Sequence, residues 1–221
     1  METTRLFLNQ SFGHVIGPEL IEIAYSCSDG GAITRAKLFE NKLEGRASAA
    51  QFAGQVNATQ GVNVYFAPSL RKMDSPRGKR TKKINVLGFP MVWAYFDDPG
   101  AAAAARPIYE AKGAPHSIVV TGKNPAVRAQ GFWLLDRIVN DQNELDEMLA
   151  GVHVGLEFHV DPKVVNADRV MCLPGCISWP KPGKEGRIAE LTEHALPEGA
   201  PTALYDRRDQ GRISPERTEA S

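Results

Sequence analysis

Cysteine, long apolar runs and net charge are all scarce in this 221-residue sequence. Three cysteines, an odd number, do not make the disulfide framework of a small secreted protein. No run of about 18 apolar residues is present, so no segment predicts a transmembrane helix. The N-terminal residues METTRLFLNQSF lack the apolar segment and cleavage site of a secretory signal. We therefore expect a cytoplasmic protein that has no membrane partner.

Charge is balanced overall but unevenly distributed. Lysine plus arginine and aspartate plus glutamate both number 26, yet residues 71–83, RKMDSPRGKRTKK, carry seven basic residues and one acid. Pro76, Gly78 and the lack of an apolar period predict a mobile loop between strands. Such a loop is either a solvated linker or a surface for nucleic-acid phosphates. The nucleic-acid-binding candidates are Arg71, Lys72, Arg77, Lys79, Arg80, Lys82 and Lys83.

Hydrophobic periodicity predicts strands that alternate with helices. Residues 89–96, FPMVWAYF, are nearly all apolar, which is typical of a central strand covered on both faces. The pattern predicts a single α+β (mixed α/β) domain at residues 1–196, with a mixed or antiparallel sheet flanked by helices, and a polar, flexible tail at 197–221. The other expected elements are strands at 20–25, 62–67, 116–121, 131–135 and 169–173, and helices at 48–58, 100–112 and 140–151.

Carboxylates stand at two places suited to a site. Asp97 and Asp98 end the most apolar strand, and strand ends open onto clefts. Because neighbouring strand residues face opposite sides, we favour Asp97 as the site-facing residue, and the other aspartate could cap the next helix. Further along, His159 and Asp161 are two residues apart and would share one face of a strand.

A possible phosphate site follows the strand at 116–121. Thr121, Gly122 and Lys123 form a turn whose backbone N–H groups could hold a phosphate, although taken alone the pattern is better explained as an ordinary hairpin. Cys172 and Cys176 have a Cys-x3-Cys spacing without a second pair, so we expect buried thiols and no zinc.

Three segments occur in a characteristic order: VWAYFDD, HSIVVTGKNPAVRAQGFWLL and HVDPKVVNADRVMCLPGCISWPKPGKEGR. Their order and spacing resemble the archaeo-eukaryotic primase superfamily, and within it the RepB-like primase domains of plasmids and phages, over residues 62–192. The resemblance implies a primase-polymerase-like fold and a metal-dependent nucleotidyltransferase of a plasmid- or phage-type DNA replication system. Such an enzyme makes primers on single-stranded DNA from nucleoside triphosphates with Mg²⁺ or Mn²⁺. No Walker-type glycine loop is present, so a helicase or other replication protein would be a separate partner.

The resemblance also assigns roles to individual residues. The catalytic candidates are Asp97, Asp98 and Asp161, and the metal-ligand candidates are Asp97, Asp161 and His159. The candidates for nucleotide or phosphate binding are Thr121, Gly122, Lys123, Arg128, Gln130, Arg169, Lys181 and Lys184.

The sequence departs from the superfamily pattern at three positions. Tyr95 stands where a partner aspartate is expected, Gln130 or Ala126 where a histidine is expected, and Cys172 where related domains have an arginine. Tyrosine does not bind Mg²⁺ as a carboxylate does. The sequence leaves open a primase-polymerase-like enzyme with partly degenerate motifs, a non-catalytic module for single-stranded or origin DNA, and an unrelated α+β protein. For the DNA-binding module the stacking candidates are Tyr65, Phe66, Trp179 and Trp133, of which Trp133 is better explained as core.

Overall fold

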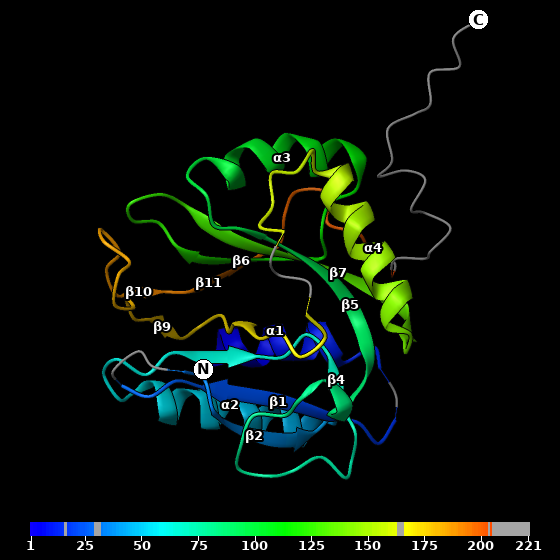
Figure 1. Ribbon diagram of the computed structural model, residues 1–221, viewed down its shortest axis with the longest axis vertical. Helices are drawn as coiled ribbons and strands as arrows, with labels where there is room; N and C mark the ends of the chain where they lie inside the picture. Colours follow the sequence, from blue (N-terminus) through cyan, green and yellow to red (C-terminus); the bar gives the residue numbers. More distant parts are fainter. Residues whose placement is uncertain (16, 29–31, 163–165, 203, 205–221) are drawn as a thin grey trace, which may run out of the picture.

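The computed structural model describes residues 1–15, 17–28, 32–162, 166–202 and 204, and Figure 1 shows their arrangement. The helices are α1 (Glu2–Phe12), α2 (Leu43–Asn57), α3 (Ala101–Lys112) and α4 (Gln142–Gly155), with a short 3₁₀ helix, η1, at Lys83–Asn85. The strands are β1 (Leu20–Tyr25), β2 (Arg35–Glu40), β3 (Val64–Phe66), β4 (Leu70–Arg71), β5 (Val86–Phe96), β6 (Ser117–Gly122), β7 (Arg128–Val139), β8 (Met171–Cys172), β9 (Ile177–Ser178), β10 (Glu190–Leu191) and β11 (Glu193–Ala195).

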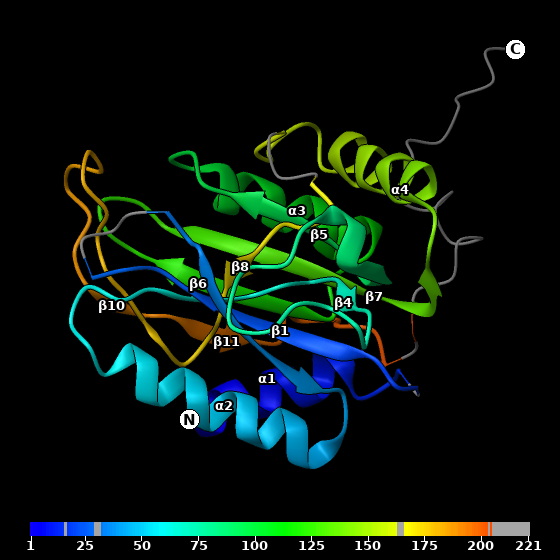
Figure 2. The same cartoon turned by 60° about the horizontal axis from the view of Figure 1, so that its bottom comes forward.

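One antiparallel sheet dominates the fold. Eight of its nine strands follow the order β11-β6-β7-β5-β4-β1-β3-β8 and β2 pairs with β1, while β9 and β10 form a separate two-stranded ribbon. In Figure 2, α3 and α4 lie on one side of the sheet and α1 and α2 on the other. The prediction of an α+β domain with an antiparallel sheet flanked by helices is confirmed. Among the described residues, none of the helices has the length and apolar character of a membrane span.

Apolar packing on both faces of the sheet explains where its strands lie. β1 has the predicted bounds, and β3, β5, β6, β7 and β8 overlap their predicted ranges. β5 buries Met91, Trp93 and Phe96, as its apolar sequence predicts for a central strand. Trp133 of β7 is 1% exposed and belongs to the same core, so it is not a stacking surface.

The C-terminal end of α4 differs from the prediction. The helix continues to Gly155, beyond the expected end at residue 151. Glu157 and Phe158 then adopt positive φ values of 53° and 61°, which a helix does not accommodate. His159 and Asp161 consequently lie in a loop, and the prediction that they share one face of a strand is wrong.

α1 and β2 have no counterpart among the expected elements, and neither do η1 and the short strands β4, β9, β10 and β11. α1 buries Phe7, Leu8 and Phe12, but it buries Thr4 and Ser11 as well, which obscures its apolar period. β2 has the sequence RAKLFE, and its three charged residues among six make its strand pattern weak. Of the predicted tail, the structure describes only residues 197–202 and 204, and Leu204 packs against the core.

The sheet divides at β1. β2 pairs along all of β1 and occupies one of its edges. β4 and β3 share the other edge, where β4 meets Leu20 and β3 meets Ile23, Ala24 and Tyr25. From there β4 leads to β5, β7, β6 and β11, whereas β3 leads to β8. The two branches therefore diverge from a common strand.

A buried ion pair joins β4 to β1 at this division. The side chains of Glu22 and Arg71 are both 0% exposed, and Arg71 Nε donates to Glu22 Oε2 at 2.7 Å. Thr81 Oγ1 donates to the same oxygen at 2.5 Å, and Arg71 Nη1 donates to Ser69 Oγ at 2.6 Å. The prediction that Arg71 binds nucleic acid is wrong, because its guanidinium is enclosed in the protein.

The rest of the basic run is anchored rather than free. The backbone N of Lys72 donates to Asn85 O, that of Arg80 donates to Thr34 O, and Arg77 Nη1 donates to Leu38 O. These contacts hold the run beside β2 and against η1, so it is not the mobile loop that its composition predicts. The cations that remain exposed on it are Lys72, Arg77, Lys79, Lys82 and Lys83.

We expect Glu22→Gln to lower the free energy of unfolding by about 3 kcal/mol, because removing one partner leaves the Arg71 charge buried without compensation. Denaturant unfolding followed by circular dichroism measures this change. Glu2→Gln is the control, since it breaks the exposed pair of Glu2 with Arg5 and should leave the midpoint unchanged. A midpoint for Glu22→Gln equal to that of the control would show that the buried pair does not stabilise the fold.

Candidate functional site

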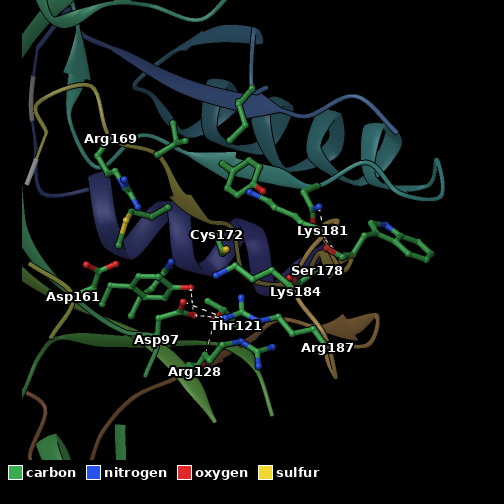
Figure 3. Close-up of a pocket in the computed structure, with 18 of the residues that line it drawn as sticks. Asp97, Thr121, Arg128, Asp161, Arg169, Cys172, Ser178, Lys181, Lys184 and Arg187 are labelled. Carbon is green, nitrogen blue, oxygen red and sulfur yellow. Dashed lines mark hydrogen bonds and ion pairs between the residues drawn. The ribbon is translucent and has the colours of Figure 1, made fainter. Parts of the chain in front are cut away.

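A cavity of about 570 Å³ lies between the two branches of the sheet. Tyr65 of β3 and Cys172 of β8 line one side, and Tyr95 of β5 and Gln130 of β7 line the other. The connection between β9 and β10 covers a further part and contributes Trp179. Figure 3 shows these walls with polar and charged side chains directed into the space between them.

Asp97 follows β5 directly, and two neighbours hold its carboxylate. Tyr95 Oη donates to Asp97 Oδ1 at 2.9 Å, and Arg187 Nη2 donates to Oδ1 at 3.0 Å and Oδ2 at 3.1 Å. Burial by itself would raise the pKa of the Asp97 carboxyl. The hydrogen bonds from Tyr95 and Arg187 and the charge of Arg187 outweigh burial, so this pKa lies below its ordinary value. Asp97 is therefore an ionised carboxylate that is already paired within the protein.

Tyr95, Gln130 and Cys172, at which the sequence comparison predicts departures from the superfamily pattern, line this one cavity, whereas Ala126, the alternative to Gln130, does not. Tyr95 and Gln130 are direct cross-strand neighbours on β5 and β7. Cys172 is paired with Tyr65 across β8 and β3. Burial raises the pKa of Tyr95 and the pKa of Cys172, so both remain protonated and neutral at neutral pH. Tyr95, Gln130 and Cys172 therefore add no charge to the cavity wall near Asp97.

The donor set around Asp97 does not fit a pair of divalent metal ions. Asp161 lines the same cavity, and its backbone N donates to Tyr95 O at 2.8 Å. Asp98 is exposed and His159 is half-buried, and neither lines the cavity. Within the described ranges, no three His, Cys, Asp or Glu side chains are grouped so that they could hold a metal ion. The structure therefore brings Asp161 to the cavity of Asp97 but does not assemble the expected ligand set for Mg²⁺ or Mn²⁺.

The turn between β6 and β7 already holds an anion, the carboxylate of Glu190. Lys123 N donates to both Glu190 oxygens at 3.0 Å, and Asn124 donates from N at 3.2 Å and from Nδ2 at 2.9 Å. Arg128 Nη2 lies 3.5 Å from Glu190 Oε2. Burial would raise the pKa of Glu190, but these hydrogen bonds and the Arg128 charge bring it below its ordinary value. The Glu190 carboxylate therefore accepts hydrogen bonds from backbone amides of the turn that the sequence predicts as a phosphate site.

The residues of this turn divide between the cavity and the surface. Thr121, Arg128 and Gln130 line the cavity, whereas Gly122 and Lys123 do not. Lys123 Nζ instead forms an exposed ion pair with Glu193 at 2.6 Å. A Cβ on Gly122 would lie 2.0 Å from Arg128 Nη2, so glycine lets the Arg128 side chain cross the end of β6.

Predicted cations and aromatic residues also meet in the cavity. Arg169, Lys181 and Lys184 line it together with Arg128. Lys181 Nζ lies 5.2 Å from the ring centroid of Tyr65, within cation–π range. Figure 3 shows Arg169 at the upper left of the cavity, Arg128 at the bottom and Lys181 at the right. Tyr65 and Trp179 line the cavity, whereas Phe66, another stacking candidate, is 1% exposed and belongs to the core.

Two functional contacts were outside the sequence-based candidates. Arg187 belongs to the Pro- and Gly-rich segment of the third motif, but nothing in that segment marks it as the partner of Asp97. Glu190 lies three residues later and carries no motif signal for its place in the β6–β7 turn. Arg80, predicted for the surface of the basic run, instead lines the cavity.

No family model matches the sequence, and no curated protein matches it. Solved structures do match in shape. The AEP domain of the primase-polymerase (PrimPol) of cyanophage S-2L aligns with 97% of this chain and 98% of that chain, with a TM-score of 0.59 and 18% identity. The primase RepB' aligns with 95% of this chain and 62% of that chain, with a TM-score of 0.56 and 14% identity. At these identities the likeness establishes the fold alone, and the chain has the fold of the archaeo-eukaryotic primases.

Proposed function

We propose that this chain is a primase-like domain of a plasmid- or phage-type replication system that binds single-stranded DNA in its cavity without synthesising primers. The main support for this proposal is that the Asp97 carboxylate already accepts hydrogen bonds from Tyr95 and Arg187, beside uncharged side chains of the cavity wall. Two-metal nucleotidyl transfer needs several carboxylates free to bind ions. The binding role needs cations and stacking surfaces, which Lys181, Tyr65 and Trp179 supply.

An active primase-polymerase is the competing function. It would use Asp97 and Asp161 with Mg²⁺ or Mn²⁺ and a nucleoside triphosphate, and Arg187 would have to release Asp97 first. The ion pair between Arg187 and Asp97 opposes this, because its side chains are 23% and 22% exposed and thus partly shielded from water. Any unwinding of the template would come from another polypeptide, such as a helicase.

We expect the wild-type chain, given a single-stranded template, nucleotides and Mg²⁺ or Mn²⁺, to bind DNA but make no primers. Gel analysis of labelled products tests this, with binding measured in parallel by fluorescence anisotropy. Robust synthesis that disappears in Asp97→Ala would overturn the proposal and establish the active enzyme.

The double variant Tyr95→Asp/Gln130→His extends this test. Residues 95 and 97 project to the same face at the end of β5, and residue 130 is the direct neighbour of residue 95, so the variant places an acid and a histidine next to Asp97. We expect metal-dependent synthesis to appear only in this double variant. The single variant Tyr95→Asp is the matched control and should remain inactive.

Glu190→Gln tests whether the chain's own carboxylate keeps phosphates out of the β6–β7 turn. Removing its charge leaves the amides of Lys123 and Asn124 and the Arg128 guanidinium without an anion, so we expect affinity for a nucleoside triphosphate to rise roughly fivefold to tenfold. Glu193→Gln is the matched control, because Glu193 pairs with Lys123 at the surface. Equal affinities in the two variants would mean that Glu190 does not compete with phosphate.

Exposed cations of the basic run should add to DNA binding. Replacing Arg77, Lys79, Lys82 and Lys83 with alanine should weaken binding at low salt. If each contacts a phosphate, the slope of log affinity against log salt should become less steep by about 0.7 per residue. A slope that does not change would assign the run to a purely structural role.

A further inference from the structure

Arg71 and Arg80 both form ion pairs with one fully buried carboxylate, Glu22, and Arg80 also contacts the residue that precedes a third arginine, Arg169. Glu22 accepts from Arg71 Nε and Thr81 Oγ1 through Oε2, and from Thr81 N at 3.1 Å through Oε1. Arg80 Nε lies 3.5 Å from Oε1, beyond a good hydrogen bond. The oxygens of Glu22 are therefore largely used by Arg71 and Thr81, and Arg80 is only partly compensated.

Donors remain unused on all three arginines. Arg80 Nη1, Arg169 Nε and Arg71 Nη2 are buried atoms that have no hydrogen-bond partner among the described residues. A buried donor left unsatisfied costs about 1–3 kcal/mol, and more when it belongs to a charged group. An anion bound from outside the chain is one group that would satisfy such donors.

Arg80 and Arg169 are the two that can reach a ligand, because both line the cavity. Arg80 Nη2 donates to the backbone O of Asp168 at 2.6 Å, which fixes its guanidinium beside the residue that precedes Arg169. The Asp168 side chain also lines the cavity, and no ion pair within 4 Å joins it to either arginine. Together with Arg71 these arginines carry three positive charges, against two negative charges on Glu22 and Asp168.

We infer that Arg80 and Arg169 bind one backbone phosphate of a single DNA strand, at the point where the strand passes from the basic run into the cavity. This inference rests on the proposed function. Arg80 belongs to the basic run, whose exposed cations Arg77 and Lys79 precede it. Figure 3 places Arg169 across the cavity from Arg128 and Arg187, so this phosphate position is separate from the one beside Asp97.

The test compares two ligands that carry phosphate, a fluorescent oligothymidylate and a fluorescent nucleoside triphosphate. Arg169→Ala removes one donor without disturbing Glu22, with which Arg169 forms no ion pair. We expect its affinity for the oligonucleotide to fall roughly tenfold, the salt slope to become less steep by about 0.7, and its affinity for the triphosphate to stay within twofold of wild type. Arg80→Lys should give a smaller loss in the same direction, because lysine keeps the charge without the planar fork.

Arg106→Ala on α3 is the matched control, since it removes an exposed arginine that pairs with Glu110. Thermal unfolding checks that each variant is folded. Oligonucleotide affinity equal to wild type in Arg169→Ala would overturn the inference, and so would a larger loss for the triphosphate, which would assign the arginines to a nucleotide. Wild-type protein that binds no oligonucleotide at all would overturn the proposed function as well, so the two failures are distinguishable.

Discussion

The buried ion pair between Glu22 and Arg71 joins β1 to β4, the strand through which one wall of the cavity is attached to the rest of the sheet. Arg71 lies on β4, a strand of two residues that pairs with β1 on one side and β5 on the other. So short a strand makes few ladder hydrogen bonds, and the enclosed charges with Thr81 and Ser69 add the contacts that keep it in register. Separating these two charges would leave each one buried without compensation, which is strongly unfavourable. The branch that carries Tyr95, Asp97 and Gln130 is held in place through this strand.

Neutral side chains set the chemistry of the cavity. Next to a buried carboxylate, a second acid would raise the pKa of one of the pair and attract a divalent cation. Tyr95 instead donates a hydrogen bond to Asp97, and Arg187 supplies the compensating charge. Gln130 and Cys172 complete the surroundings without adding charge. The negative charge of Asp97 is consequently balanced inside the protein, and the cavity presents mainly cations to a ligand.

The segment that runs from the end of β9 into β10 supplies both of the internal partners. Arg187 reaches Asp97, and three residues later Glu190 reaches the β6–β7 turn and Arg128. Its carboxylate accepts hydrogen bonds from two backbone amides, which is the way a turn of this kind binds phosphate. Lys181 and Lys184, on the same segment, face the cavity instead. The segment therefore neutralises the two charged positions beside β5 and β6 and adds cations elsewhere.

The sequence by itself determined much of the secondary structure and the order of the motifs. Apolar periodicity located the central strand, and strand alternation separated Asp97, which lines the cavity, from Asp98, which is exposed. The departures from the motif pattern at Tyr95, at Gln130 or Ala126, and at Cys172 stay predictions from the sequence, because they rest on local residue order alone.

Only the tertiary structure decided which charges meet. Arg71 and Glu22 are 49 residues apart, Lys123 and Glu190 are 67 apart, and Asp97 and Arg187 are 90 apart. No local sequence pattern links such pairs. A sequence-based prediction therefore places every arginine of a basic run at the surface, including those that the fold buries. The division of the sheet at β1 buries Arg71, turns Arg80 toward the cavity and leaves Lys79 in solvent. Burial and long-range pairing, which depend on the packing of distant strands, gave these chemically alike residues different roles.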